Sequence, residues 1–393
     1  MSASATPAGL ASFLPDELGY TGEHDLLRRT ARRLLGERCP IREVRRLGAD
    51  PVGFDRGLWS ELAELGWPGL HLPDRLGGAG LDQLSMALVL EESGRALYPG
   101  PLLHGALAGL AIARGGSAGQ AERLLPDLAA GRTIATIALV EGSSWELEAT
   151  RASARPVEEG YELEGEKEHV AWGHAADLLV APFRWEGGLS LFAVPLDGPG
   201  IEIEPEVAID PSRRLARVRF TGAQVAADAR LLSGGAVLGD LLAPALVYLS
   251  SEMVGAAAAA LDLTAAYARE RIQFDRPIGA FQAVKHPLVD VLIAVERARS
   301  LALAAAVALD HAPEQALRAA RMAKVSAEQA LSFACDRAIQ LHGGFGFTWD
   351  CDAHLYYKRA LASAATWGDA LHHRRALAAD LRRMAGFAPR STP

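Results

Sequence analysis

The chain has 393 residues, of which 50% are hydrophobic and 22% charged, so it carries enough apolar material for more than one buried core. Its 40 basic and 48 acidic residues give a net charge of −8, which disfavours a nucleic-acid partner. Three scattered cysteines, Cys39, Cys335 and Cys351, exclude a disulfide framework and fit a reducing compartment. Because no leader pattern or uninterrupted apolar stretch of spanning length is present, we expect a cytoplasmic protein without a membrane span.

Residues 1–128 are expected to form a helical domain. Leu81, Leu84 and Leu88 recur at helical spacing in LDQLSMALVLEESGRALY, which indicates one apolar helix face.

Residues 129–235 have a different character and are expected to form a compact, barrel-like β domain. Short β-favouring runs appear here, such as TIATIALV at 133–140 and LSLFAVPL at 189–196. In IEIEPEVAI, Ile201, Ile203, Val207 and Ile209 alternate with acids, and nearby Gly and Pro residues supply turns.

Residues 236–393 return to long helices rich in Ala, Leu and Arg, interrupted at 276–281, 311–313 and 342–347. The order helical, β, helical predicts an α+β multidomain protein.

Common signatures of hydrolysis and nucleotide binding are missing. GGSAG at 115–119 fits GxSxG only by spacing, because it lies in the part expected to be helical and does not follow a strand as an elbow would. The sequence has no HExxH, no P-loop and no GxGxxG after a strand, so a catalytic triad or a metal centre is unsupported.

Three separated segments together resemble the acyl-CoA dehydrogenase family. They are LGWPGLHLPDRLGGAG at 65–80, ARERIQFDRPIGAFQAVKH at 268–286 and QLHGGFGF at 340–347, and their order and spacing span nearly the whole chain. The likeness is greatest to bacterial members of sterol and fatty-acid catabolism, some of which assemble from two different subunits. The resemblance implies that the C-terminal helices form a four-helix bundle.

The resemblance also implies FAD, bound across a subunit interface. The residues that match family contacts to the pyrophosphate and adenosine of FAD are Arg271, Gln273, Phe274, Phe281, Gln282, Gln340 and Gly344. The planar fork of Arg271 suits phosphate oxygens, while Gln340 and Gly344 would approach from the neighbouring chain. Core packing of the two phenylalanines and a surface ion pair of Arg271 are the structural alternatives.

The family's catalytic base is harder to place. Dehydrogenation of a thioester removes the α-proton as the β-hydride passes to the flavin, so a carboxylate must face the flavin. The two positions at which relatives carry that glutamate correspond to Trp367 and Ala245, and a substrate-binding arginine corresponds to Leu246.

Glu252 is the remaining candidate base, two helical turns after Ala245 and on about the same helix face. A structural role, in which an arginine holds Glu252 at a helix crossing, is favoured over catalysis because unpaired buried charges are rare.

The β domain departs from the family where it supports the flavin. VEGSSWE at 140–146 replaces the usual TEPGAGSD, and KEHVAWG at 167–173 replaces KMWITNG. His169 then stands in place of a tryptophan beside the flavin, and Ala171 in place of a threonine that donates to it. Trp172 is a candidate for stacking on the cofactor, with core packing as the alternative.

We therefore expect flavin-dependent α,β-dehydrogenation of an acyl-CoA or related acyl thioester, bulky or sterol-derived, by a homo- or hetero-oligomer of two or four chains. One alternative is a catalytically silent subunit that completes the FAD site of a partner. Another is altered chemistry on the same fold, motivated by the departures in the β domain.

Overall fold

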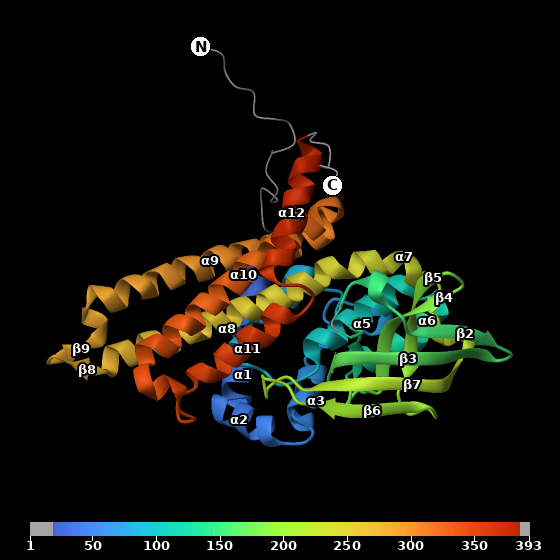
Figure 1. The fold of residues 1–393 in the computed structure, drawn as a ribbon, viewed down its shortest axis with the longest axis horizontal. Coiled ribbons are helices and arrows are strands. Elements are labelled where there is room, and N and C mark those ends of the chain that lie inside the picture. The colour runs from blue at the N-terminus through green and yellow to red at the C-terminus, as the bar shows by residue number, and fades with distance from the viewer. Residues whose placement is uncertain (1–18, 143, 386–393) are drawn as a thin grey trace, which may run out of the picture.

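The computed structural model describes residues 19–142 and 144–385 of the chain. Figure 1 shows a β-sheet at one end, long C-terminal helices extending to the other, and N-terminal helices beside both. The expected order of a helical part, a β part and a second helical part is confirmed, and with it the α+β class.

The N-terminal part is all helical, and side-chain caps set several of its helix starts. Asp55 accepts backbone N–H groups at the start of α3, and Asp82 does the same for Ser85 in α4. Because α4 begins only after Asp82, Leu81 lies outside the helix and is exposed, whereas Leu84 and Leu88 are buried. The helices are α1 (Gly22–Arg38), α2 (Ile41–Ala49), α3 (Arg56–Glu64), α4 (Gln83–Arg95), α5 (Leu102–Gly115) and α6 (Ala118–Ala129).

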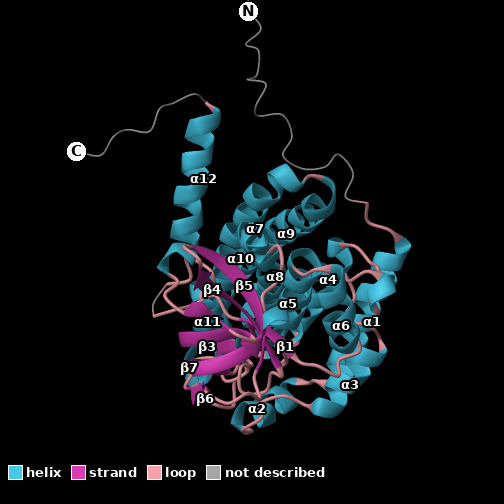
Figure 2. Cartoon of the chain, turned by 90° about the vertical axis from the view of Figure 1, so that its right-hand side faces the viewer, coloured by secondary structure: helices cyan, strands magenta, loops and turns pink. Residues whose placement is uncertain are grey.

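The middle part is one seven-stranded sheet, visible from its side in Figure 2. Its order is β1-β4-β2-β3-β7-β6, with β5 paired to β4, and its own core includes Leu163, Phe183, Phe192 and Phe220. The strands are β1 (Ala135–Ile137), β2 (Ser153–Val157), β3 (Gly160–Ala171), β4 (Leu178–Trp185), β5 (Gly188–Pro195), β6 (Ile201–Glu206) and β7 (Leu215–Ala226).

The expected alternation in IEIEPEVAI holds only in part. Strand β6 ends at Glu206, so Val207 and Ile209 lie in the following loop and are exposed, while Ile201 and Ile203 pack against the sheet core. The same loop continues to Asp210, which is fully buried against helix α11.

The C-terminal part is built around α8, which crosses the molecule in Figure 1 with α9, α10 and α11 beside it. Residues 234–270 are long and apolar enough to span a membrane, but 89% of the most apolar window is buried inside the protein, as in a core helix. The elements are α7 (Gly234–Val237), α8 (Leu242–Glu270), β8 (Ile272–Gln273), β9 (Arg276–Pro277), α9 (Gln282–His311), α10 (Pro313–His342), α11 (Ala353–Ala365) and α12 (Ala370–Met384).

Helices α4 and α8 cross with their backbones in contact. A Cβ atom added to Gly94 would lie 1.9 Å from the carbonyl oxygen of Glu252, and one added to Gly255 would lie 1.7 Å from that of Glu91. Each helix therefore contributes a glutamate and, three residues later, a glycine. The glycine of each helix packs against the backbone of the glutamate of the other helix. Only glycine permits this approach.

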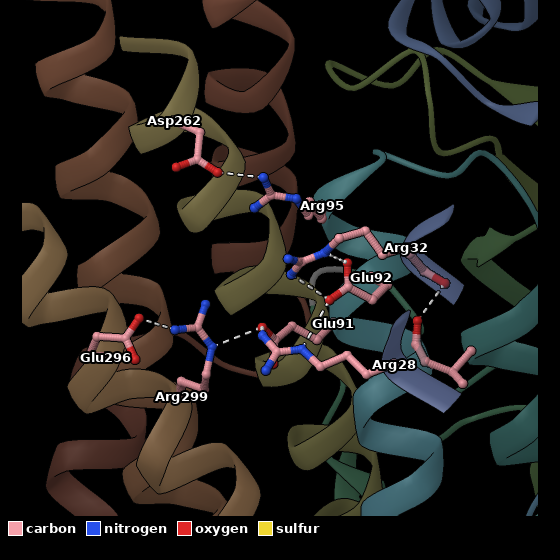
Figure 3. A network of polar contacts seen from close by, with 10 residues as sticks. Arg28, Arg32, Glu91, Glu92, Arg95, Asp262, Glu296 and Arg299 are labelled. Atoms are coloured by element: carbon pink, nitrogen blue, oxygen red, sulfur yellow. Dashed lines mark hydrogen bonds and ion pairs between the residues drawn. The ribbon is translucent and has the colours of Figure 1, made fainter. Parts of the chain in front are cut away.

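Ion pairs stabilise the same crossing and join the N-terminal part to the bundle (Figure 3). Glu91 accepts from Arg28 of α1 at 2.8 Å and from Arg299 of α9 at 2.9 Å, and it is almost fully buried. Glu92, also buried, accepts from Arg28 and from Arg32. Because these carboxylates are paired on several sides, their burial is tolerated.

Candidate functional site

The expected cofactor-binding segments meet at the far end of the bundle, where α8 ends. A hollow of about 560 Å³ lies between the hairpin that follows α8 and the 3₁₀ turn Gly343–Phe347 that follows α10. Arg271, Gln273 and Gly344 line this hollow. The resemblance suggested that Arg271 and Gly344 come from different chains, whereas here they line the same hollow of one chain.

The hairpin β8–β9 turns through two residues that both adopt the left-handed conformation. Phe274 has φ 53° and Asp275 has φ 60°, as a type I′ turn requires, although Asn or Gly usually fills these positions. A left-handed aromatic residue is strained, and the Phe274 side chain is 86% exposed. The hairpin therefore presents an exposed aromatic side chain next to Gln273, which lines the hollow.

Phe281 is the remaining candidate that contacts this hairpin. Phe281 packs edge-on against Phe274, with ring centroids 6.1 Å apart, and the guanidinium of Arg276 lies 4.1 Å from the centroid of the Phe281 ring. Phe274 is thus not in the core, and Phe281 is only partly buried. Gln282, in the first turn of α9, and Gln340, in the last turn of α10, are exposed but are not among the residues that line the hollow.

The space around the glycines of the 3₁₀ turn shows where the backbone is open to a ligand. Gly343 needs its φ of 61°, and a Cβ on Gly346 would lie 2.7 Å from the carbonyl oxygen of Ile339. A Cβ on Gly344 would meet nothing within 4 Å, so nothing in this chain requires glycine there. Arg271 likewise has no ion pair within the described residues. An exposed arginine beside bare backbone fits the pyrophosphate of FAD.

Glu252 lies elsewhere, about 28 Å along α8 from Arg271 at the usual rise per residue. It is buried at the α4–α8 crossing, where its carboxylate accepts a hydrogen bond from Arg213 of the loop between β6 and β7. The arrangement that the sequence favoured, an arginine holding Glu252 at a helix crossing, is the one present.

A second buried ion pair joins the same loop to the bundle. Arg359 of α11 donates to Asp210 and to the hydroxyl of Ser212, the latter at 2.8 Å, and both charged side chains are at most 2% exposed. Burial raises the pKa of Asp210, but the charge of Arg359 and the hydrogen bond from Ser212 outweigh burial and hold the pKa below its usual value. This group of four charges, Asp210, Arg213, Glu252 and Arg359, is called the junction cluster below.

The two positions expected for a catalytic glutamate are buried among apolar groups. Ala245 is 2% exposed and Trp367 5% exposed, and the indole of Trp367 lies 5.6 Å from the ring of His104 on α5. Burial, with Arg213 and Arg359 nearby, lowers the pKa of His104 well below its usual value. His104 is therefore neutral at pH 7.

In the two segments of the β domain that differ from the family, several side chains contact other residues of the same chain. Glu141 pairs with Lys167, which is completely buried, and burial lowers the pKa of Lys167 to about 8 despite the opposing effect of Glu141. His169 is exposed and bonds to Glu206 at 2.7 Å. Trp172 is 2% exposed and packs edge-on against Phe54, so the core alternative holds for it.

Sequence reasoning did not identify Arg213, Arg359 or His104. Arg213 and Arg359 belong to no motif that the sequence offers, and their partners lie 39 and 149 residues away in the chain. The one available signal was DPSRR at 210–214, a polar run that interrupts a β-favouring region.

Comparison with known proteins gives concordant matches over most of the chain. The sequence profile described as "Acyl-CoA dehydrogenase, N-terminal domain" matches residues 21–132, and "Acyl-CoA dehydrogenase, C-terminal domain" matches residues 234–381. The acyl-CoA dehydrogenase IpdE2 of Mycobacterium tuberculosis is 34% identical over 87% of this chain and 92% of its own length. IpdE2 of Mycolicibacterium smegmatis is 33% identical over 91% and 99%.

Solved structures agree with the sequence relatives. A variant of the Tcur3481-Tcur3483 steroid ACAD has 32% identity and a TM-score of 0.85, covering 94% of this chain and all of that one. The ChsE4-ChsE5 complex from Mycobacterium tuberculosis has 28% identity and a TM-score of 0.86, covering 96% of this chain and 100% of that one.

Proposed function

Because the chain belongs to the acyl-CoA dehydrogenase family of FAD-dependent oxidoreductases, we propose that it is a subunit of a heteromeric acyl-CoA dehydrogenase in which a different chain carries the catalytic base. In this assignment the chain binds the pyrophosphate and adenosine end of FAD, and the complex dehydrogenates the acyl group at its α and β carbons. The observation that carries the proposal is the burial of Glu252 in an ion pair with Arg213.

Glu252 is poorly placed to act as a base. If Glu252 took a proton from a substrate, its carboxylate would lose the negative charge that pairs with Arg213, which would leave a guanidinium buried without its counter-charge. The positions that relatives use are taken by Ala245 and Trp367, and neither side chain accepts a proton. We therefore place the catalytic base, a glutamate, on another chain.

The residues of the hollow have a role that needs no base. Arg271 would donate charge-assisted hydrogen bonds to the pyrophosphate, and the bare backbone at Gly344 would let the phosphates approach. When bound, FAD accepts the hydride that leaves the β carbon. The exposed Phe274 and the partly buried Phe281 would shield that end of the cofactor from water.

We assign the substrate to bulky, ring-bearing acyl thioesters of CoA. Support comes from the structural relatives, one of which is described as a steroid ACAD and another as a complex of two named chains. The second description also favours a hetero-oligomer over a homo-oligomer.

The test is Glu252→Gln, which keeps the shape of the side chain and removes its charge. The variant would be purified together with the protein encoded beside it, and flavin bleaching would be followed after addition of an acyl-CoA that the wild-type complex oxidises. We expect bleaching per bound FAD to persist while stability falls, because a buried ion pair has been weakened.

Glu92→Gln is the matched control, since Glu92 is also buried and ion-paired but belongs to the α1–α4 contact. If Glu252→Gln folds, binds FAD and loses a factor of about 10²–10⁴ in bleaching rate while Glu92→Gln does not, Glu252 is the base and the proposal is wrong.

A further inference from the structure

A second pocket lies where the N-terminal helices meet the bundle, and it shares no lining residue with the hollow beside Arg271. Its volume is about 210 Å³, and its walls come from the last turns of α1 and α4, the start of α2 and the first turn of α11. Because sites for drug-sized ligands measure about 300–1,000 Å³, this pocket suits a smaller molecule.

Most of the pocket wall is apolar. Leu35 and Tyr356 are buried there, and Cys39 joins them at the end of α1. Burial raises the pKa of the Cys39 thiol to about 12, so the thiol is neutral at pH 7 and packs as a small hydrophobic group. The hydroxyl of Tyr356 donates to the carbonyl oxygen of Arg95 at 3.2 Å, which leaves its ring as the surface offered to a ligand. The wall therefore fits the apolar body of a ligand.

Gly36 lies inside α1 and lines the same pocket. Glycine is among the least favourable residues within a helix, so a glycine there calls for a reason in packing or binding. Gly94 and Gly255 are each explained by contact with the backbone of a neighbouring helix. A Cβ on Gly36, in contrast, would meet nothing within 4 Å. The open backbone at Gly36 is thus space for a group outside this chain.

Two arginines of the pocket supply positive charge, and Figure 3 shows both beside Glu92. Arg32 donates through Nε and Nη2 to Glu92, at 2.9 and 2.8 Å, and Arg95 donates through Nη2 to Asp262 of α8. A guanidinium has five N–H donors, so the Nη1 group of each arginine remains for a further acceptor. The charge of Glu92 is already matched, because Arg28 donates to it as well. This side of the pocket therefore attracts an anion.

We propose that this pocket binds a small apolar carboxylate, whose acid group accepts hydrogen bonds from Arg32 and Arg95 and whose apolar body packs over Gly36 and Cys39. Two guanidinium groups suit a carboxylate, because its two oxygens can accept from both at once. The ligand would contact the N-terminal helices and the bundle together, so its binding stabilises their contact. This site goes beyond the proposed function, because it involves neither FAD nor proton abstraction.

Cyclohexanecarboxylate is the probe, since it carries a single ring and a single carboxylate. Isothermal titration calorimetry of the purified full chain should show saturable binding. Thermal unfolding should shift to higher temperature as the probe concentration rises, because the probe binds the folded state. Cyclohexanecarboxamide has a similar shape without the charge and should bind at least about tenfold more weakly.

Gly36→Leu tests the location of the site. Leucine favours a helix and its Cβ would meet nothing here, so the variant should be at least as stable as wild type. Its side chain should fill the pocket and abolish binding of the probe. Gly22→Leu is the matched control, because it makes the same change at an exposed glycine of α1 outside the pocket and should leave binding unchanged.

Arg95→Gln tests the charge and should weaken binding about tenfold, because it removes a charged donor. Arg123→Gln, which breaks an exposed ion pair with Asp228 outside this pocket, is the control and should bind as wild type does. Three results would overturn the proposal: no saturable binding of the carboxylate by wild type, equal binding of the amide, or unchanged binding by Gly36→Leu.

Discussion

Helix α8 connects two polar regions that are built in opposite ways. At the junction cluster, Glu252 and Asp210 are deeply buried, and each accepts a hydrogen bond from an arginine of another segment. At the end of the same helix, Arg271 is exposed and lines an open hollow without an ion pair in the described residues. A buried carboxylate that is paired with an arginine is typical of a structural contact, whereas an exposed cation beside bare backbone is typical of a ligand site.

The largest expected effect is at the junction cluster. Arg359→Met removes the partner of Asp210 and leaves a carboxylate buried at 1% exposure, which should lower the free energy of unfolding by about 3–5 kcal/mol. Urea unfolding followed by circular dichroism measures the change. Arg45→Met is the control, because Arg45 pairs with the partly exposed Asp352 at 2.7 Å and should cost less than about 1 kcal/mol. Equal losses in the two variants would remove the distinction between the regions.

A smaller effect, of a different kind, is expected at the hollow. Arg271→Ala should weaken FAD binding by about ten- to a hundredfold, since it removes charge-assisted hydrogen bonds worth roughly 1.5–3 kcal/mol, while urea stability without FAD stays as in wild type. Fluorescence titration of the co-purified complex gives the affinity. Arg269→Ala carries the same charge change two residues earlier, outside the hollow, and should bind FAD normally. Unchanged affinity in Arg271→Ala would refute the assignment.

The smallest effects are expected from alanine substitutions of two neighbouring glycines, Gly344 and Gly346. Gly344→Ala should leave stability unchanged and weaken FAD binding several-fold, because its Cβ would occupy space that the chain itself leaves open. Gly346→Ala should lower the free energy of unfolding by about 1–3 kcal/mol, because its Cβ would clash with the backbone of Ile339. Thermal unfolding and FAD titration of both variants test this; a stability loss at Gly344 would contradict it.

The architecture was largely predictable because it rests on local periodicity and composition. Helical spacing around Leu84 and Leu88, and the β-favouring runs near Ile201, indicated the order of the three parts. The end of β6 was missed. The loop that follows the strand carries Asp210, whose ion pair with Arg359 spans 149 residues and has no local signal in the sequence.

The site was predictable only where its residues are close in sequence. The segment RIQF brought Arg271 and Gln273 together, and the structure adds Gly344 from QLHGG to the same hollow. The partner of Glu252 could not be derived, since Arg213 comes from another domain. Whether the seven proposed residues bind FAD stays a prediction, which the substitutions above test.

The crossing of α4 and α8 corresponds to a pattern in the amino-acid sequence. Glu91 and Gly94 on one helix, and Glu252 and Gly255 on the other, repeat the same spacing, and each glycine faces the backbone of the opposite glutamate. Replacement of either glycine by a larger residue pushes the two helices apart. The glutamates of both helices would then lose their present contacts. The two Glu-x-x-Gly segments should therefore be inherited together, and a relative that has lost one of them should dock its N-terminal helices on the bundle in a different way.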